Sequence, residues 1–136
     1  MRKEDGLRWD FLWVALGSAI GGAGRYWISG WVASTRWGEV FPAGTLVVNL
    51  VGSFLIGVVA ALGEPGGRLW LSPVTREFLM LGLMGGFTTF SSFSLQTLSL
   101  LQAGEFLLAG LNILLSVAAC LLAVWIGYQL GAVVSR

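Results

Sequence analysis

The chain has 136 residues, of which 56% are hydrophobic and 11% charged, a composition far from that of a soluble domain. Its net charge of +1 excludes the basic surface that nucleic acid requires. With one cysteine and no histidine, an internal disulfide, a multi-cysteine metal site and Ser-His catalysis are also excluded. These features predict one integral membrane domain over residues 1–136 that binds or passes a solute in the lipid bilayer, and no enzyme.

Long uncharged stretches predict the helices that cross the membrane, since about 20 apolar residues span a bilayer. Uncharged stretches lie between Glu39 and Glu64, between Glu77 and Glu105, and between Glu105 and Arg136. Another apolar stretch starts near the N-terminus and is interrupted by a single arginine. We therefore predict an all-α fold of four transmembrane helices, at about residues 9–31, 41–63, 74–102 and 106–133.

The arginine in the first predicted helix is Arg25, within the segment GGAGRYW. No acidic residue lies close to it in the sequence. A long cationic side chain here either extends along the helix to reach water or attracts anions toward an entrance. The sequence leaves both interpretations open.

The third predicted helix contains an unusual run, GGFTTFSSFS, in its middle. The adjacent Gly85 and Gly86, followed by two threonines, predict an unwound segment. Unwound backbone at membrane depth is tolerated only where protein buries it or where it borders a wet cavity, and its carbonyl groups can bind cations. The alternative is that the hydroxyl groups donate back to their own helix. These hydroxyl side chains are Thr88, Thr89, Ser91, Ser92 and Ser94.

Two phenylalanines follow the predicted break. Phe90 and Phe93 are three residues apart and share one face of a helix. Aromatic rings have a positive edge, so two rings turned edge-on can attract an anion. Ordinary core packing explains the same spacing, and the sequence does not decide between them.

Two polar stripes lie on otherwise apolar helices, each with a spacing of four residues. The second helix carries Thr45, Asn49 and Ser53, and the fourth carries Asn112, Ser116 and Cys120. A buried amide such as that of Asn49 either joins neighbouring helices or lines a pore. No Asp or Glu lies well inside a predicted span, so the proton relay common in proton-coupled transporters is missing.

The segments GGAGRYW, GTLVVNLVGSFLIG and GGFTTFSSFS, in this order, resemble the Fluc (CrcB-like) family of fluoride channels. The resemblance implies a fluoride-selective channel in the plasma membrane of a prokaryote that passively exports cytoplasmic fluoride. It also implies an antiparallel, dual-topology homodimer with two pores and a central structural sodium ion. Fluoride, sodium, lipid and a second copy of the chain are thus the expected partners.

The same resemblance assigns residues to these sites. Sodium would be bound by the backbone carbonyl groups of Gly85 and Thr88. The fluoride pore would be lined by Asn49, Phe90, Phe93, Ser92, Thr45, Ser116 and Asn112, with Arg25 at its entrance. The fourth helix departs from the family pattern, which has a tyrosine and two serines where this chain has Asn112, Ser116 and Cys120.

Lys and Arg counts do not fit an equal mixture of two orientations. One side of the membrane would hold Arg2, Lys3, Arg8, Arg68, Arg76 and Arg136, against Arg25 and Arg36 on the other. A small proton-coupled antiporter, similar to the small multidrug resistance transporters, is the alternative function, although it needs an intramembrane carboxylate. A third interpretation is an assembly subunit that transports nothing.

Overall fold

The computed structural model describes residues 3–64 and 71–135, and their side chains from Trp9 onward. Arg2, Arg68 and Arg136, which enter the charge comparison above, lie outside the described residues. In the described part of the chain, every regular element is a helix. This confirms the predicted all-α class.

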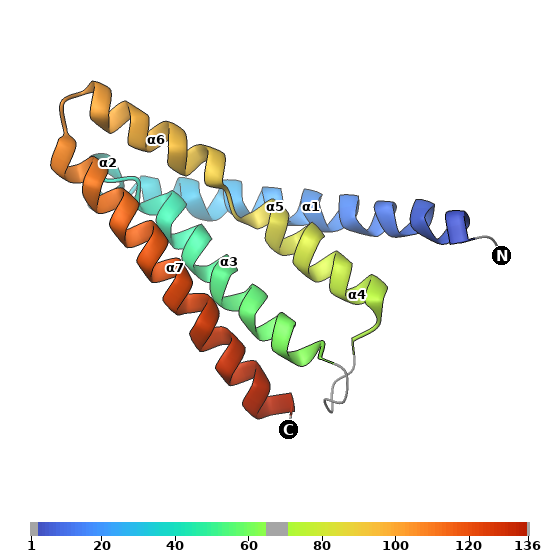
Figure 1. Ribbon diagram of the computed structural model, residues 1–136. Coiled ribbons are helices and arrows are strands. Elements are labelled where there is room, and N and C mark those ends of the chain that lie inside the picture. The colour runs from blue at the N-terminus through green and yellow to red at the C-terminus, as the bar shows by residue number, and fades with distance from the viewer. Residues whose placement is uncertain (1–2, 65–70, 136) are drawn as a thin grey trace.

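Eight helical segments follow one another along the described part of the chain (Figure 1). They are α1 (Lys3–Ala33), α2 (Arg36–Val40), α3 (Ala43–Leu62), α4 (Pro73–Glu77), the π-helix η1 (Phe78–Met84), α5 (Gly85–Phe87), α6 (Phe90–Gln102) and α7 (Phe106–Ser135). Helix α1 begins at Lys3, earlier than the predicted residue 9, and the short α2 was not predicted. Segments α4 to α6 together form the third predicted helix.

Within residues 3–64 and 71–135, three helical stretches are long and apolar enough to cross a membrane: Ala43–Leu62, Pro73–Gln102 and Phe106–Ser135. Helix α1 is the fourth long helix, with 31 residues. Its glycines, tryptophans and Arg25 lower its mean hydropathy. The described chain is therefore an all-α membrane protein with three clear candidate spans.

Helices α3 and α7 lie side by side along most of their length (Figure 1). Their backbones approach so closely that a Cβ atom at Gly57 would overlap the carbonyl oxygen of Val124, and one at Gly127 would overlap that of Phe54. Small residues allow this approach in a membrane, where packing rather than the hydrophobic effect joins helices. Glycine is thus required on both sides of this contact.

Helix α1 crosses the other long helices at a large angle and packs against η1 and α5 (Figure 1). A Cβ atom at Gly86 of α5 would lie 2.5 Å from the carbonyl oxygen of Ser18 on α1. Gly86 therefore serves this close packing. The contact holds the first half of the broken third helix on α1, while α6 packs on α7 instead.

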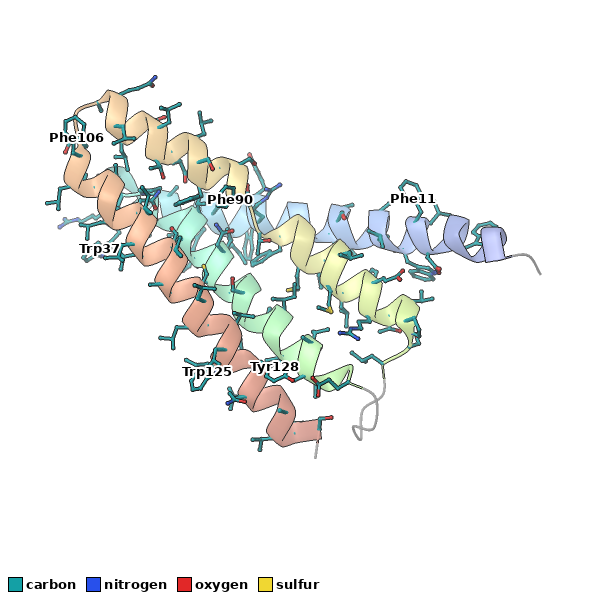
Figure 2. All side chains as sticks on the ribbon, viewed as in Figure 1. Phe11, Trp37, Phe90, Phe106, Trp125 and Tyr128 are labelled. Atoms are coloured by element: carbon teal, nitrogen blue, oxygen red, sulfur yellow. The ribbon has the colours of Figure 1, made fainter. Side chains whose placement is uncertain are left out.

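Large apolar side chains cover the outside of the helices, as expected for a surface that faces lipid. Figure 2 shows Phe11, Trp37, Phe106 and Trp125 pointing away from the helices, and all four are exposed. Beyond the end of α3, Glu64 accepts a hydrogen bond from the hydroxyl of Tyr128 on α7. This contact links the ends of the paired helices.

Candidate functional site

The third long helix is broken at Thr88 and Thr89. Both residues have extended backbone, with φ and ψ of −88° and 159° for Thr88 and −152° and 112° for Thr89. Gly85, at −62° and −38°, is helical, and so is Gly86. The unwound segment predicted for this run is present, but it begins after Phe87 rather than at the glycines, because the Gly86 backbone packs on α1.

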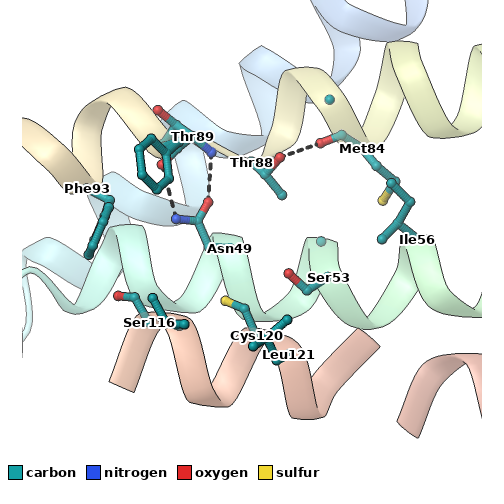
Figure 3. Close-up of a pocket in the computed structure, with 14 residues that line it drawn as sticks. Asn49, Ser53, Ile56, Met84, Thr88, Thr89, Phe93, Ser116, Cys120 and Leu121 are labelled. Carbon is teal, nitrogen blue, oxygen red and sulfur yellow. Dashed lines mark hydrogen bonds between the residues drawn. The ribbon is translucent and has the colours of Figure 1, made fainter. Parts of the chain in front are cut away.

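The side chain of Asn49 on α3 holds the break through two hydrogen bonds (Figure 3). The backbone N–H of Thr89 donates to Asn49 Oδ1 at 2.7 Å, and Asn49 Nδ2 donates to the Thr89 carbonyl at 3.1 Å. A primary amide offers a donor and an acceptor in the same arrangement as a peptide group. Asn49 Oδ1 therefore replaces the helical acceptor that the Thr89 N–H has lost, as buried backbone requires.

The hydroxyl of Thr89 holds the other side of the break. Thr89 precedes α6, and its Oγ1 accepts a hydrogen bond from the Ser92 N–H at 3.1 Å, the arrangement of a helix N-cap. Thr88 does not share this role, because its hydroxyl donates to the Met84 carbonyl at 3.0 Å. Some hydroxyls in this run thus bond back to their own helix, while Thr89 organises the next one.

These contacts release two particular carbonyl groups. In a continuous helix the Thr89 N–H would donate to the Gly85 carbonyl, and the Ser92 N–H would donate to the Thr88 carbonyl. Here the first N–H donates to Asn49 and the second to the Thr89 hydroxyl. The oxygens of Gly85 and Thr88 therefore lack their helical donors. Carbonyl oxygens of this kind suit a hard cation.

A pocket of about 420 Å³ borders the break on one side (Figure 3). Its polar lining comes from three helical segments: Asn49 and Ser53 on α3, Gly85, Thr88 and Thr89 at the break, and Ser116 and Cys120 on α7. The two polar stripes predicted on separate helices therefore face the same space for part of their length. Both carbonyl-bearing residues of the candidate cation site lie on this lining.

Phe90 and Phe93 also line this pocket. Their ring centroids are 5.3 Å apart, with the planes tilted by 50°. Phe93 is buried, with 8% of its surface exposed, whereas Phe90 is 77% exposed in the isolated chain. Ordinary core packing explains Phe93, whereas Phe90 lines the pocket and is also exposed, like the apolar side chains that face lipid.

A second pocket, of about 260 Å³, lies on another side of the break. Arg25, Tyr26 and Ser29 of α1 line it together with Thr45, Val48, Thr89 and Ser92. Thr89 borders both pockets, so the Asn49–Thr89 contact stands between them. Arg25 therefore borders a polar pocket next to the break.

Asn112 has a different environment from the rest of its stripe. It is 2% exposed, and its Nδ2 donates to the hydroxyl of Thr97 on α6 at 2.9 Å. The Thr97 hydroxyl donates in turn to the Phe93 carbonyl at 2.8 Å. Asn112 thus joins α6 to α7 and fixes the helix that carries the phenylalanines, while Ser116 and Cys120 reach the first pocket.

The site residue that sequence reasoning missed is Thr89, which is buried and makes hydrogen bonds through its N–H, carbonyl and hydroxyl. Its position three residues before Ser92 is the spacing of an N-cap residue and the backbone N–H that donates to it. Tyr26 and Ser29, in the second pocket, were also missed. Their spacing on α1 carries no signal that distinguishes them from lipid-facing residues.

Together, these features define a class: an all-α membrane protein whose third long helix is broken, with side chains supporting the break and with two pockets beside it. The sequence model of the family described as CrcB-like protein, Camphor Resistance (CrcB), matches residues 12–128. The chain belongs to this family, which confirms the resemblance drawn from its motifs.

Individual relatives agree with this assignment. A protein of Methylocella silvestris is 51% identical over 127 residues, which cover 93% of this chain and 96% of the relative. Proteins of Opitutus terrae and Paramagnetospirillum magneticum are each 54% identical, over 87% and 90% of this chain and 89% and 95% of their own lengths. All three carry the name fluoride-specific ion channel FluC, the name of a channel and not of an enzyme.

Proposed function

We propose that this protein is a fluoride-selective channel through which cytoplasmic fluoride leaves a bacterial cell passively across the plasma membrane. The observation that carries the proposal is the break at Thr88–Thr89, with hydrogen-bonding groups from three helices around one pocket. Fluoride is strongly hydrated, so a selective path must replace water with donors that still let the ion leave. The relatives named as fluoride channels support the same ion.

The pocket lining suggests how fluoride would pass. Asn49 Nδ2 carries two N–H bonds, of which one is donated to the Thr89 carbonyl, so the other can be offered to an anion. The ring edges of Phe90 and Phe93 add weak positive potential without a full charge. Ser116 adds a hydroxyl from α7. Such contacts replace water without binding the ion too tightly.

The second pocket would supply the entrance. Arg25 borders it with the hydroxyls of Thr45 and Ser92. A cation at the mouth of a polar pocket raises the local concentration of anions without having to enter the pore. Asn112 supports the pore indirectly in this proposal, by holding α6 against α7.

We infer that α1 is the fourth membrane-spanning helix. At about 1.5 Å per residue, a helix of this length exceeds the roughly 30 Å of hydrocarbon. Exposed tryptophans lie toward both ends, Trp9 and Trp13 at one and Trp27 and Trp31 at the other. Tryptophan favours the two membrane interfaces, so this pattern supports a crossing.

The proposed assembly is an antiparallel dimer of identical chains with two pores. Phe90 lines the first pocket but is largely exposed in the single chain, and a second copy of the chain would cover it. Labelling of intact cells tests the orientation, using Ala103→Cys in a Cys120→Ser background. An impermeant thiol reagent should label about half of the protein before lysis. Labelling of all or none of it would contradict dual topology.

The proposed cation is a structural sodium ion bound by the carbonyl groups of Gly85 and Thr88 from each chain. Carbonyl ligands fit this ion, since both oxygens have lost their helical N–H donors and both residues line one pocket. Among the described residues, no three His, Cys, Asp or Glu side chains gather to hold a metal ion. When bound, sodium would join the two copies at their common centre.

The direct test is release of fluoride from liposomes that contain the purified protein, measured with a fluoride electrode. Rapid fluoride release with retention of chloride is expected. The rate should not depend on a pH gradient, because the carboxylates Asp10, Glu39, Glu64, Glu77 and Glu105 lie toward the ends of the long helices or between them and cannot relay protons across the membrane. Flux driven by a pH gradient would favour the antiporter, and no flux from folded protein would favour an assembly subunit.

A further inference from the structure

Two separate hydrogen bonds that open the break involve Thr89. Its N–H donates to Asn49 Oδ1, and its hydroxyl oxygen accepts from the Ser92 N–H. The first contact takes a donor away from the Gly85 carbonyl, and the second takes one away from the Thr88 carbonyl. Both oxygens of the candidate cation site are therefore released by contacts of one threonine.

The proton of the Thr89 hydroxyl has a partner as well. Thr89 Oγ1 donates to Ser92 Oγ at 3.1 Å. Because Ser92 Oγ accepts this bond, its own proton must point elsewhere, and Ser92 borders the pocket that contains Arg25. The Thr89 hydroxyl thus has two effects. By accepting from the Ser92 N–H it keeps the Thr88 carbonyl free for the cation, and by donating to Ser92 Oγ it orients a hydroxyl that borders the Arg25 pocket.

We propose that Thr89 is a positioning residue that keeps the cation site open and couples it to the anion pathway. This inference rests on the proposed sodium site and goes beyond it, because Thr89 itself touches neither ion. Without the hydroxyl, the Ser92 N–H has no acceptor at the cap, and a continuous helix would supply the Thr88 carbonyl in its place. The α6 helix would then extend backward, and the Thr88 oxygen would be withdrawn from the cation.

The substitution Thr89→Val removes the hydroxyl at nearly constant shape, while Thr89→Ser keeps it. The first measurement is the melting temperature of each purified protein in sodium chloride and in potassium chloride at equal ionic strength. We expect wild type and Thr89→Ser to melt higher in sodium. In Thr89→Val this difference should disappear, or its half-maximal sodium concentration should rise about tenfold or more. If Thr89→Val does not fold, Thr89→Ala makes the same comparison without a branched side chain.

A matched control comes from the same helix. The exposed Ser99 donates its hydroxyl to the Leu95 carbonyl at 3.0 Å and contacts neither pocket. Ser99→Ala should therefore keep the wild-type sodium shift, that is, the rise in melting temperature from potassium chloride to sodium chloride. Loss of the shift in this variant as well would mean that any hydroxyl on α6 matters, and it would overturn the specific role of Thr89.

The fluoride efflux of the same proteins separates this inference from the proposed function. If the Thr89→Val protein keeps the wild-type sodium shift, the inference is overturned, whatever fluoride flux this protein shows. Wild type that conducts fluoride with no sodium shift overturns both the sodium site and the inference, but leaves the channel. If the wild-type protein shows a sodium shift that the Thr89→Val protein lacks, the positioning role is supported. If the same wild-type protein conducts no fluoride, the proposed channel function is overturned.

Discussion

Helices α3 and α7 contact each other through backbone, whereas α5 and α6 meet at a break held by side chains. In the helix pair, Gly57 and Gly127 let carbonyl groups approach within van der Waals contact. At the break, Asn49 and the Thr89 hydroxyl replace hydrogen bonds that the helix has given up. The pair has no polar side chain at the closest of these contacts, Gly57 with Val124 and Gly127 with Phe54, and is suited to rigidity. The break keeps polar groups available at membrane depth and is suited to ions.

The largest effect is expected where the helix pair itself is disrupted. In Gly127→Val, the new side chain would overlap the Phe54 carbonyl, and overpacking of this kind costs about 1–3 kcal/mol or more. We expect the variant to lose its folded, monodisperse state in size-exclusion chromatography. Gly110→Val on the same helix is the control, because a Cβ atom there meets open space. Elution of Gly127→Val with wild type would show that this contact is not required.

The next largest effect is expected from the rings beside the break. Phe90→Ile and Phe93→Ile each remove a ring edge from the pocket, so fluoride efflux from liposomes should fall by about tenfold or more while the dimer stays intact. Because Phe93 is buried and Phe90 exposed in the single chain, Phe93→Ile should also lower the melting temperature more. Normal flux in both variants would remove the rings from the mechanism.

A smaller effect is expected at the contact that fixes α6. Asn112→Leu and Thr97→Val each break the hydrogen bond between α6 and α7. Thermal unfolding of both single variants and the double variant should give a coupling energy of about 0.6–1 kcal/mol, the usual value for such bonds within membranes. Additive losses would mean that the two side chains act independently and that Asn112 serves another purpose.

The smallest effect is expected at the entrance. Arg25→Gln removes one positive charge from the second pocket, so fluoride flux should fall about twofold to fivefold at low ionic strength. At 1 M salt the screening length is about 3 Å, and the difference should nearly vanish. Arg25→Lys should restore most of the flux. A loss that does not change with salt would assign Arg25 a structural role.

The sequence predicted the helices well because charge is expensive inside a membrane. The segments that lack charge between Glu39 and Glu64, and after Glu105, contain α3 and α7 almost residue for residue. The start of α1 was less accurate, since charged residues before Trp9 continue the same helix. Propensity alone does not reveal where a helix leaves the apolar region.

The site was predicted less completely, for two physical reasons. Glycine marks both unwinding and close packing, and Gly86 serves the packing against Ser18, so the break lies further along, at Thr88–Thr89. Spacing shows which residues share a helix face but not which helix they meet. Asn112 and Ser116 have the spacing of one stripe, yet only Ser116 lines the first pocket.

The most direct test of the central claim is electrical recording from the purified protein in a planar bilayer, with a fluoride gradient and equal chloride on both sides. A passive, fluoride-selective channel predicts a current that reverses at the equilibrium potential of fluoride and stays there when a pH gradient is added. A current that reverses at zero voltage, or that follows the proton gradient, would contradict the account.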